Sequence, residues 1–174
     1  MKKIFLTLAI FLSTPYITAH SAQIGVLDVD KIIQESSAVV DIQKKVDAKK
    51  VVYENEINKK QSQLEAEQKK LEDKKITLSK EAFEKEVKTF ETKVDDLKTY
   101  IDRKQNSLKK ASIDAMSKVN DKVKTLVSDI AKEKELDAII PASQTLYFKE
   151  ELDITADLLS RLNKKITKVD VKFE

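Results

Sequence analysis

The chain of 174 residues contains no cysteine, one glycine (Gly25) and one histidine (His20). Without cysteine it can form neither a disulfide nor a thiolate metal site. A single glycine excludes glycine-rich phosphate or dinucleotide loops, because those loops need several close backbone approaches. Apart from His20, acid–base catalysis would fall to carboxylates, lysine or tyrosine. We therefore expect no enzyme: no catalytic residue, no metal site and no cofactor.

Neither sign of charge dominates, and aromatic residues make up only 6% of the chain. The 33 basic and 30 acidic residues give a formal net charge of +3; without Lys2 and Lys3 the remaining 31 and 30 give +1. Proteins that bind nucleic acids carry a marked positive surplus, so we expect no nucleic-acid partner. A charged fraction of 36% favours long solvated helices over a thick globular core.

Residues 1–21 have the layout of a secretory signal peptide. Two lysines precede the short apolar run Ile4–Leu12, and small residues lead to Ser21, where we expect cleavage. A helix of this run is only about 14 Å long, whereas a bilayer core is roughly 30 Å thick. A membrane-spanning helix is therefore the weaker alternative. We predict an exported, periplasmic protein that does not span a membrane.

No glycine or proline occurs between Lys31 and Ile140. Such a long stretch without a breaker indicates a coiled coil rather than globular helices. Apolar residues recur in it at spacings of three, four and seven, as at the a and d positions of heptads. These residues are Val39, Ile42, Val46, Ile57, Leu64, Leu71, Leu78, Phe83, Val87, Phe90, Val94, Leu97, Ile101, Val119, Val123, Leu126 and Ile130. We assign residues 36–135 to a coiled-coil arm.

The predicted seam is weakest between Ile57 and Leu78, where only one core position per heptad is apolar. Each missing large apolar side chain forgoes about 1.5–3 kcal/mol of burial, so this stretch should bend easily. The heptad phase breaks between Leu78 and Phe83, and Ser79 is a suitable N-cap for a second helix. We predict an antiparallel helical hairpin that reverses here. The alternative is one unbroken helix in an intermolecular coiled coil.

A short strand and a helix start precede the arm. Gln23–Asp28 is rich in β-branched and apolar residues and is predicted to be a strand, with close backbone packing at Gly25. The carboxylate of Asp30 is expected to cap a helix that begins at Lys31.

Further short elements follow the arm. Leu136–Ile140 and Thr145–Phe148 are predicted to be strands separated by a turn, and Asp153 is expected to cap a final helix. The tail Thr167–Glu174 alternates apolar and polar residues and is either an extra strand or a loose end.

Residues 22–35 and 136–174 form a body near the size below which one core rarely stands alone. Three strands cannot cover both faces and both edges, so we expect oligomerisation, with edge strands of several chains closing a shared barrel. The residues expected to build this barrel are Ile24, Val26, Ile139, Ile140, Leu146 and Phe148. The fold class is mainly α, with a small β body and a long antiparallel arm.

Two patterns suggest chemistry but have simpler explanations. Ser107–Lys110 matches a Ser-x-x-Lys acyl-enzyme motif, but it lies within a predicted helix and lacks the companion Lys-Thr-Gly. Asp28 and Asp30 share one strand face and could bind a divalent cation, although a strand end followed by a helix cap explains them better.

Two groups on the arm are candidate binding residues. Off-seam apolar residues offer weak contacts to a non-native chain, and several arms would make such contacts multivalent. They are Val40, Val51, Val52, Ile76 and Tyr100. A basic cluster could bind the phosphates of an anionic glycolipid such as lipopolysaccharide, unless it is a solvated face balanced by nearby carboxylates. It comprises Arg103, Lys104, Lys109 and Lys110.

The body segments resemble the Skp/OmpH family of periplasmic chaperones. The stretch Ile24–Ser36 is similar to the opening strand and helix of that family, and Leu136–Ile140 to its strand after the arm. Asp153–Leu159, which reads DITADLL, resembles its closing helix and is the most telling stretch. The order of signal, strand, long hairpin, strands and helix also fits.

The resemblance implies a homotrimer in which strands of three chains form a barrel and three helical hairpins enclose a cavity. It further implies an ATP-independent holdase that binds unfolded outer-membrane β-barrel proteins before membrane insertion. Two features depart from the family: the mature chain is nearly neutral and the tail is long. The rival hypotheses are a structural coiled-coil spacer and a lipopolysaccharide-binding protein of the periplasm.

Overall fold

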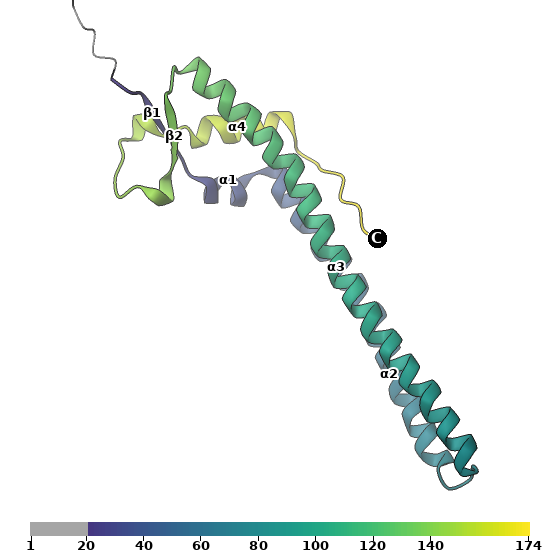
Figure 1. The fold of residues 1–174 in the computed structure, drawn as a ribbon. Helices are drawn as coiled ribbons and strands as arrows, with labels where there is room; N and C mark the ends of the chain where they lie inside the picture. Colours follow the sequence, from purple (N-terminus) through teal and green to yellow (C-terminus); the bar gives the residue numbers. More distant parts are fainter. Residues whose placement is uncertain (1–20) are drawn as a thin grey trace, which may run out of the picture.

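The computed structural model describes residues 21–174, so nearly all of the predicted signal peptide lies outside the described residues. The elements are β1 (Ile24–Leu27), α1 (Val29–Glu35), α2 (Ser37–Lys74), α3 (Lys80–Glu133), β2 (Ala138–Pro141), the 3-10 turns η1 (Ala142–Gln144) and η2 (Glu150–Leu152), and α4 (Thr155–Lys165). The strands, α1 and α4 gather at one end of the molecule, and α2 and α3 run away from it side by side (Figure 1). We call these two parts the body and the arm.

The body is organised around a two-stranded parallel sheet. Ile24 of β1 lies opposite Ala138 of β2, and the register continues to Leu27 and Pro141. On its other side, β1 forms a bridge with the segment before α4, where the Ile154 N–H donates to the Val26 carbonyl at 2.9 Å. Parallel strands need a long crossover, and here the whole arm is that crossover.

The single glycine lies where β1 approaches its neighbours most closely. A Cβ on Gly25 would lie 2.8 Å from Leu136 Cδ1 and 3.4 Å from Ile139 Cγ1. The predicted strand with tight packing at Gly25 is therefore confirmed.

The helix after β1 begins earlier than predicted, and the residue that caps it is different. The Asp28 carboxylate accepts the Lys31 N–H at 2.9 Å, so Asp28, and not Asp30, caps α1. The Asp28 N–H in turn donates to Thr155 Oγ1 at 2.9 Å. Asp28 thus connects the end of β1 to the start of α4. Asp30 lies within the first turn of α1.

Beyond β2, the second predicted strand is wrong. Residues 145–148 follow η1 as irregular chain, and Leu146 and Tyr147 are exposed at 108% and 83%. Despite their β-type sequence they join no sheet: within residues 21–174 the sheet consists of β1 and β2 alone. The predicted cap of α4 is wrong by one residue: Ile154 occupies the N-cap position, and Asp153, one residue earlier, accepts the Thr155 N–H at 2.8 Å.

The arm consists of two helices joined by residues 75–79. At the turn, Ser79 Oγ accepts the Ala82 N–H at 3.3 Å, so the predicted cap of the second helix is confirmed. The chain is therefore not one unbroken helix. Along 38 and 54 residues respectively, α2 and α3 extend for about 57 Å and about 81 Å.

The main core lies where α4 crosses the base of the arm. Leu158 and Leu162 of α4 are fully buried together with side chains of α2 and α3, namely Ala38, Ile42, Ala115, Val119, Leu126 and Ile130. Two polar contacts add to this packing. Asn163 Oδ1 accepts the Ser37 N–H at 2.8 Å and so caps α2, and Arg161 binds Glu133 of α3 through two hydrogen bonds of 2.8 and 2.6 Å.

Leu158→Ala should lower the free energy of unfolding by about 2–5 kcal/mol, because it removes a fully buried side chain and leaves a cavity. The measurement is urea unfolding followed by circular dichroism. The control is Ile76→Ala at the turn, where the side chain is 92% exposed and the change should stay within about 0.5 kcal/mol. Equal losses in the two variants would contradict the assignment of the core.

Candidate functional site

The outer part of the arm, residues 54–106, contains no fully buried side chain. Tyr53 at 4% exposure and Ser107 at 6% mark its inner boundary. The apolar seam residues of this part, from Ile57 to Leu78 and from Phe83 to Ile101, are all half-buried. In a pair of helices each seam side chain is covered by the one facing helix and stays open to solvent on its flanks. The prediction of an incompletely packed seam is therefore confirmed for residues 57–78, and the same holds for the facing stretch of α3.

Polar pairs occupy the alternate core positions of the outer arm. The Lys60 ammonium lies 4.9 Å from the centre of the Tyr100 ring, Glu67 pairs with Lys93 at 2.6 Å, and Lys74 pairs with Glu86 at 2.8 Å. These three cross-helix pairs, which we call rungs, repeat every seven residues on both helices. Half-exposed ion pairs contribute only about 0–1 kcal/mol each, less than the apolar side chains they replace.

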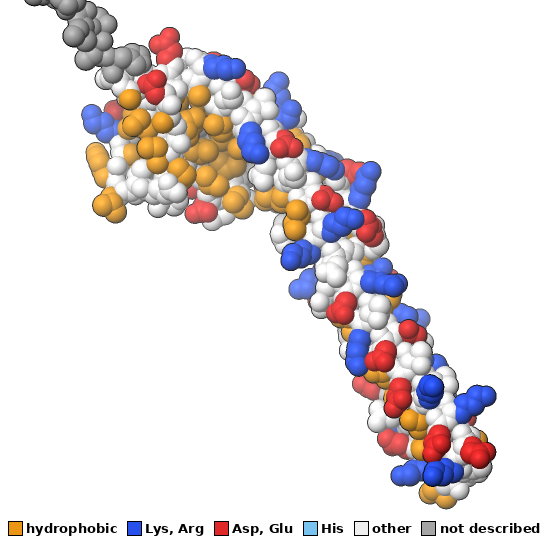
Figure 2. All heavy atoms as spheres, viewed as in Figure 1, with side chains coloured by type: hydrophobic (Ala, Val, Ile, Leu, Met, Phe, Trp, Pro, Cys, Tyr) orange, Lys and Arg blue, Asp and Glu red, His pale blue; other side chains and the backbone are white. Residues whose placement is uncertain are grey.

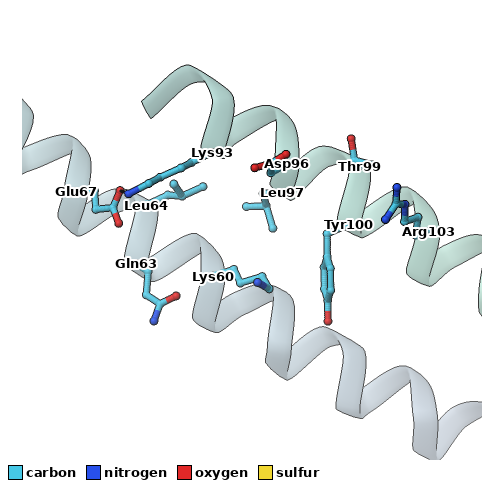
Figure 3. A pocket seen from close by; sticks show the side chains of 10 residues that line it. All are labelled: Lys60, Gln63, Leu64, Glu67, Lys93, Asp96, Leu97, Thr99, Tyr100 and Arg103. Carbon is cyan, nitrogen blue, oxygen red and sulfur yellow. Dashed lines mark hydrogen bonds and ion pairs between the residues drawn. The ribbon is translucent and has the colours of Figure 1, made fainter. Parts of the chain in front are cut away.

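Open grooves lie between the rungs. The larger has a volume of ≈ 460 Å³ and is drawn in Figure 3, where Leu97 and Tyr100 point from α3 towards α2. A second, of ≈ 310 Å³, lies nearer the turn beside Lys74 and Glu86. Both grooves combine apolar floors with charges of both signs, which suits weak contacts with varied chains better than one tight ligand.

The predicted client-contact residues are scattered, and the structure does not bring them together. Val40, Val51, Val52 and Ile76 are exposed at 37%, 54%, 44% and 92% along α2 and the turn. Tyr100 is half-buried between the helices, and its hydroxyl donates to Glu56, which raises the pKa of Tyr100.

The predicted basic cluster is partly engaged in internal contacts. Lys104 lies over the rings of Tyr53 and Tyr100 at 4.6 and 5.3 Å. Lys110 pairs with Glu174 at 2.6 Å, and this carboxylate raises the pKa of Lys110. Arg103 and Lys109 remain exposed. An open groove of ≈ 480 Å³ lies beside Arg103, Lys104 and Lys110.

The predicted barrel residues differ in accessibility. Val26 is buried within the protomer, Leu146 is fully exposed, and the others (Ile24, Ile139, Ile140 and Phe148) are half-buried. Figure 2 shows apolar side chains gathered on one face of the body, whereas the arm is largely charged. Sequence reasoning missed the exposed pair Val29 and Ile33. Their i, i+4 spacing on α1 could have indicated a second apolar face of that helix.

The tail is neither an extra strand nor a loose end: residues 167–174 lie extended along the base of the arm (Figure 1). Val169 is 4% exposed and packs into the core, and Val171 packs against the same cluster. The Val169 N–H donates to Asp41 at 3.0 Å, and Lys45 donates to the Val169 carbonyl at 2.7 Å. The alternation of apolar and polar residues in the tail is visible in the sequence, but the surface of the arm on which the tail packs is not.

Membrane-crossing helices and metal clusters are both missing from the part of the chain that the structure describes. Among residues 21–174, no helix combines the length and hydropathy needed to cross a bilayer. The same residues contain no group of three or more carboxylate or imidazole side chains arranged to hold a metal ion.

Comparison with solved structures defines the class: a small strand-and-helix body that carries a long helical pair. The crystal structure of a candidate outer membrane chaperone (OmpH-like) from Caulobacter crescentus CB15 matches with a TM-score of 0.80, covering 89% of this chain and 92% of that one. At 15% identity this likeness shows the fold alone. An uncharacterised protein of Aquifex aeolicus (strain VF5) is 30% identical over 94% of this chain and 98% of its own length.

The model of the OmpH-like outer membrane protein family matches residues 23–162. The chain therefore belongs to this family, and the resemblance to Skp/OmpH found in the body segments is confirmed.

Replacing one rung with leucine, as in Glu67→Leu/Lys93→Leu, should stabilise the outer arm, because burial then replaces a weak ion pair. We expect slower amide hydrogen exchange in residues 54–106. The control, Glu65→Leu/Lys88→Leu, makes the same chemical change at two exposed positions and should leave exchange unaltered. Equal exchange in both variants would contradict the marginal packing of the outer arm.

Acid should loosen the tail. Lys45 and the Val169 N–H both hydrogen-bond the Asp41 carboxylate and hold its pKa below the ordinary value, with Lys168 of the tail adding charge attraction. Lys45 lies on the same helix as Asp41, so the part of the lowering that depends on docking comes from the Val169 N–H and Lys168. This part favours the docked tail above the ordinary carboxyl pKa, about 3.9, and is lost as pH falls through the lowered pKa. The amide chemical shift of Val169 should follow this titration. In Asp41→Asn the titration should disappear; its persistence would contradict the contact.

Proposed function

We propose that this protein is an ATP-independent periplasmic holdase that keeps unfolded outer-membrane β-barrel proteins from aggregating before insertion. Membership of the OmpH-like family supports the proposal, and the Caulobacter protein that shares the fold is itself a candidate outer membrane chaperone. The observation that carries it is the surface of the arm: exposed apolar side chains are scattered along α2 and the turn, and shallow grooves of the outer arm lie among charges of both signs. Such a surface binds weakly at many points and stays soluble.

Weak contacts suffice for holding when several arms act on one client. Each exposed residue such as Val51 or Ile76 buries little surface, but linked contacts multiply because the second and later ones are intramolecular. An underfilled seam also lets an arm bend at low cost, so the enclosed volume can follow the size of the client. No step needs nucleotide hydrolysis, and the protein is proposed to have no enzymatic activity.

The arms are proposed to be brought together by a homotrimer formed through the body. The outer edge of β2 pairs with no strand within residues 21–174, and an unpaired edge is a template for another chain. The exposed Leu146 and Tyr147 lie a few residues beyond that edge strand. Covering them with a second and third copy would supply the core that a body of this size lacks.

Lipopolysaccharide binding is the second candidate, favoured by the groove beside Arg103, Lys104 and Lys110. Its weakness is that Lys104 already lies over two tyrosine rings and Lys110 already pairs with Glu174. An anionic glycolipid would have to compete with both contacts.

Native mass measurement of chain 22–174, with and without a urea-unfolded outer-membrane β-barrel protein, tests the proposal. We expect a trimer that takes up one client and, in a parallel light-scattering assay without ATP, prevents its aggregation. A monomer at micromolar concentration, or unchanged aggregation, would contradict the proposal and leave a coiled-coil spacer. Steeply salt-dependent lipopolysaccharide binding that is lost in Arg103→Ala/Lys104→Ala, without client binding, would favour the second candidate.

A further inference from the structure

Residues 167–174 bind the arm in the manner of an extended peptide ligand. Burial alternates along them: Val169, Val171 and Phe173 turn towards the protein, and the residues between them are exposed. This is the period of a β-strand, although the segment belongs to no sheet. The tail therefore keeps a strand-like conformation on a surface made of helices.

The surface recognises the tail largely through its backbone. Besides the two bonds of Val169 with Asp41 and Lys45, Lys118 donates to the Asp170 carbonyl at 3.0 Å. Ser107 Oγ accepts the Glu174 N–H at 2.9 Å, and the Tyr53 hydroxyl donates to the Glu174 carbonyl at 3.3 Å. The five side chains come from both helices of the arm, and we call them the cradle. Since every peptide has the same backbone groups, these five bonds do not require the sequence of the tail.

The side-chain part of the contact selects only a pattern. Val169 enters the core at the base of the arm, and Val171 packs against it. Lys168 and Lys172 are exposed, and among the outward side chains Glu174 pairs with the arm, through Lys110 at 2.6 Å. The cradle thus fits extended segments with apolar residues at alternate positions, and an acidic residue at the position of Glu174 adds one exposed ion pair.

We propose that the cradle is a binding site for extended client segments and that the tail is its exchangeable internal occupant. Strands of outer-membrane barrels alternate apolar and polar residues with this period, and an unfolded barrel offers unpaired backbone groups. This inference rests on the proposed holdase function and names the client segment that the arm would recognise. Segments that bury larger apolar side chains would displace the tail, whereas weaker segments would not.

A reversible disulfide tests whether the tail must leave the cradle before a client segment can bind. Because Ser107 Oγ lies 2.9 Å from the Glu174 nitrogen, the two Cα atoms lie within about 7 Å, so Ser107→Cys/Glu174→Cys should form a bond. The chain has no other cysteine to compete. The oxidised variant should bind a urea-unfolded outer-membrane barrel several-fold more weakly than the same variant after reduction. Ser107→Cys alone is the control and should not respond to reductant.

A second experiment asks whether the emptied cradle binds a peptide. A fluorescent peptide with the sequence of residues 167–174 should bind the chain truncated after Ile166 about tenfold more tightly than the full chain, as read by anisotropy. A peptide of the same composition with its three apolar residues adjacent should bind weakly. Equal client binding by the oxidised and reduced forms would overturn the inference, even if truncation prevents folding.

The two proposals fail in distinguishable ways. If the reduced full chain prevents aggregation but locking the tail has no effect, the holdase stands and the cradle is a structural contact only. If the full chain fails to hold clients at all, the proposed function falls whatever the peptide does.

Discussion

The pairing of β1 with β2 joins two segments that are separated in sequence by the entire arm. Closing so long a loop costs conformational entropy, although this cost grows only slowly with loop length. The closure is reinforced by contacts that converge on the same place: the bridge from Val26 to Asp153, the Asp28–Thr155 hydrogen bond and the buried face of α4. Without them the ends of α2 and α3 would not be held together, and the arm would have no base.

From this base outward, packing declines in steps. Next to α4 the two helices bury Ala38, Ile42 and Ile130 almost completely, and the docked tail covers the following turns. Beyond Tyr53 and Ser107 only half-buried side chains and polar rungs hold the helices together. Local opening free energy follows buried contacts, so the arm should be rigid at its root and mobile towards the turn.

Much of this could be predicted from the sequence because it depends on local signals. The absence of breakers, the heptad spacing, the phase break before Ser79 and the β-branched segments around Gly25 and Ile139 each reflect residues close in sequence. The wrong predictions concern features that depend on neighbours in space rather than in sequence. Thr145–Phe148 has strand-like residues but no neighbouring strand, and whether Asp28 or Asp30 caps α1 depends on where β1 ends. The tail shows its alternation plainly, but its partners lie more than 50 residues away in sequence, on α2 and α3.

The rungs have an effect separate from their small contribution to stability. Apolar residues alone would allow α2 and α3 to slide past each other by one heptad, because leucine packs almost equally well against the next apolar neighbour. A slide in one direction would set Glu67 opposite Glu86 and Lys60 opposite Lys93, and a slide in the other would set Lys74 opposite Lys93. Like charges would then meet at two positions after the first slide and at one position after the second. The rungs thus fix the register of α2 against α3 although each pair is weak. The arm can therefore bend while its length stays constant.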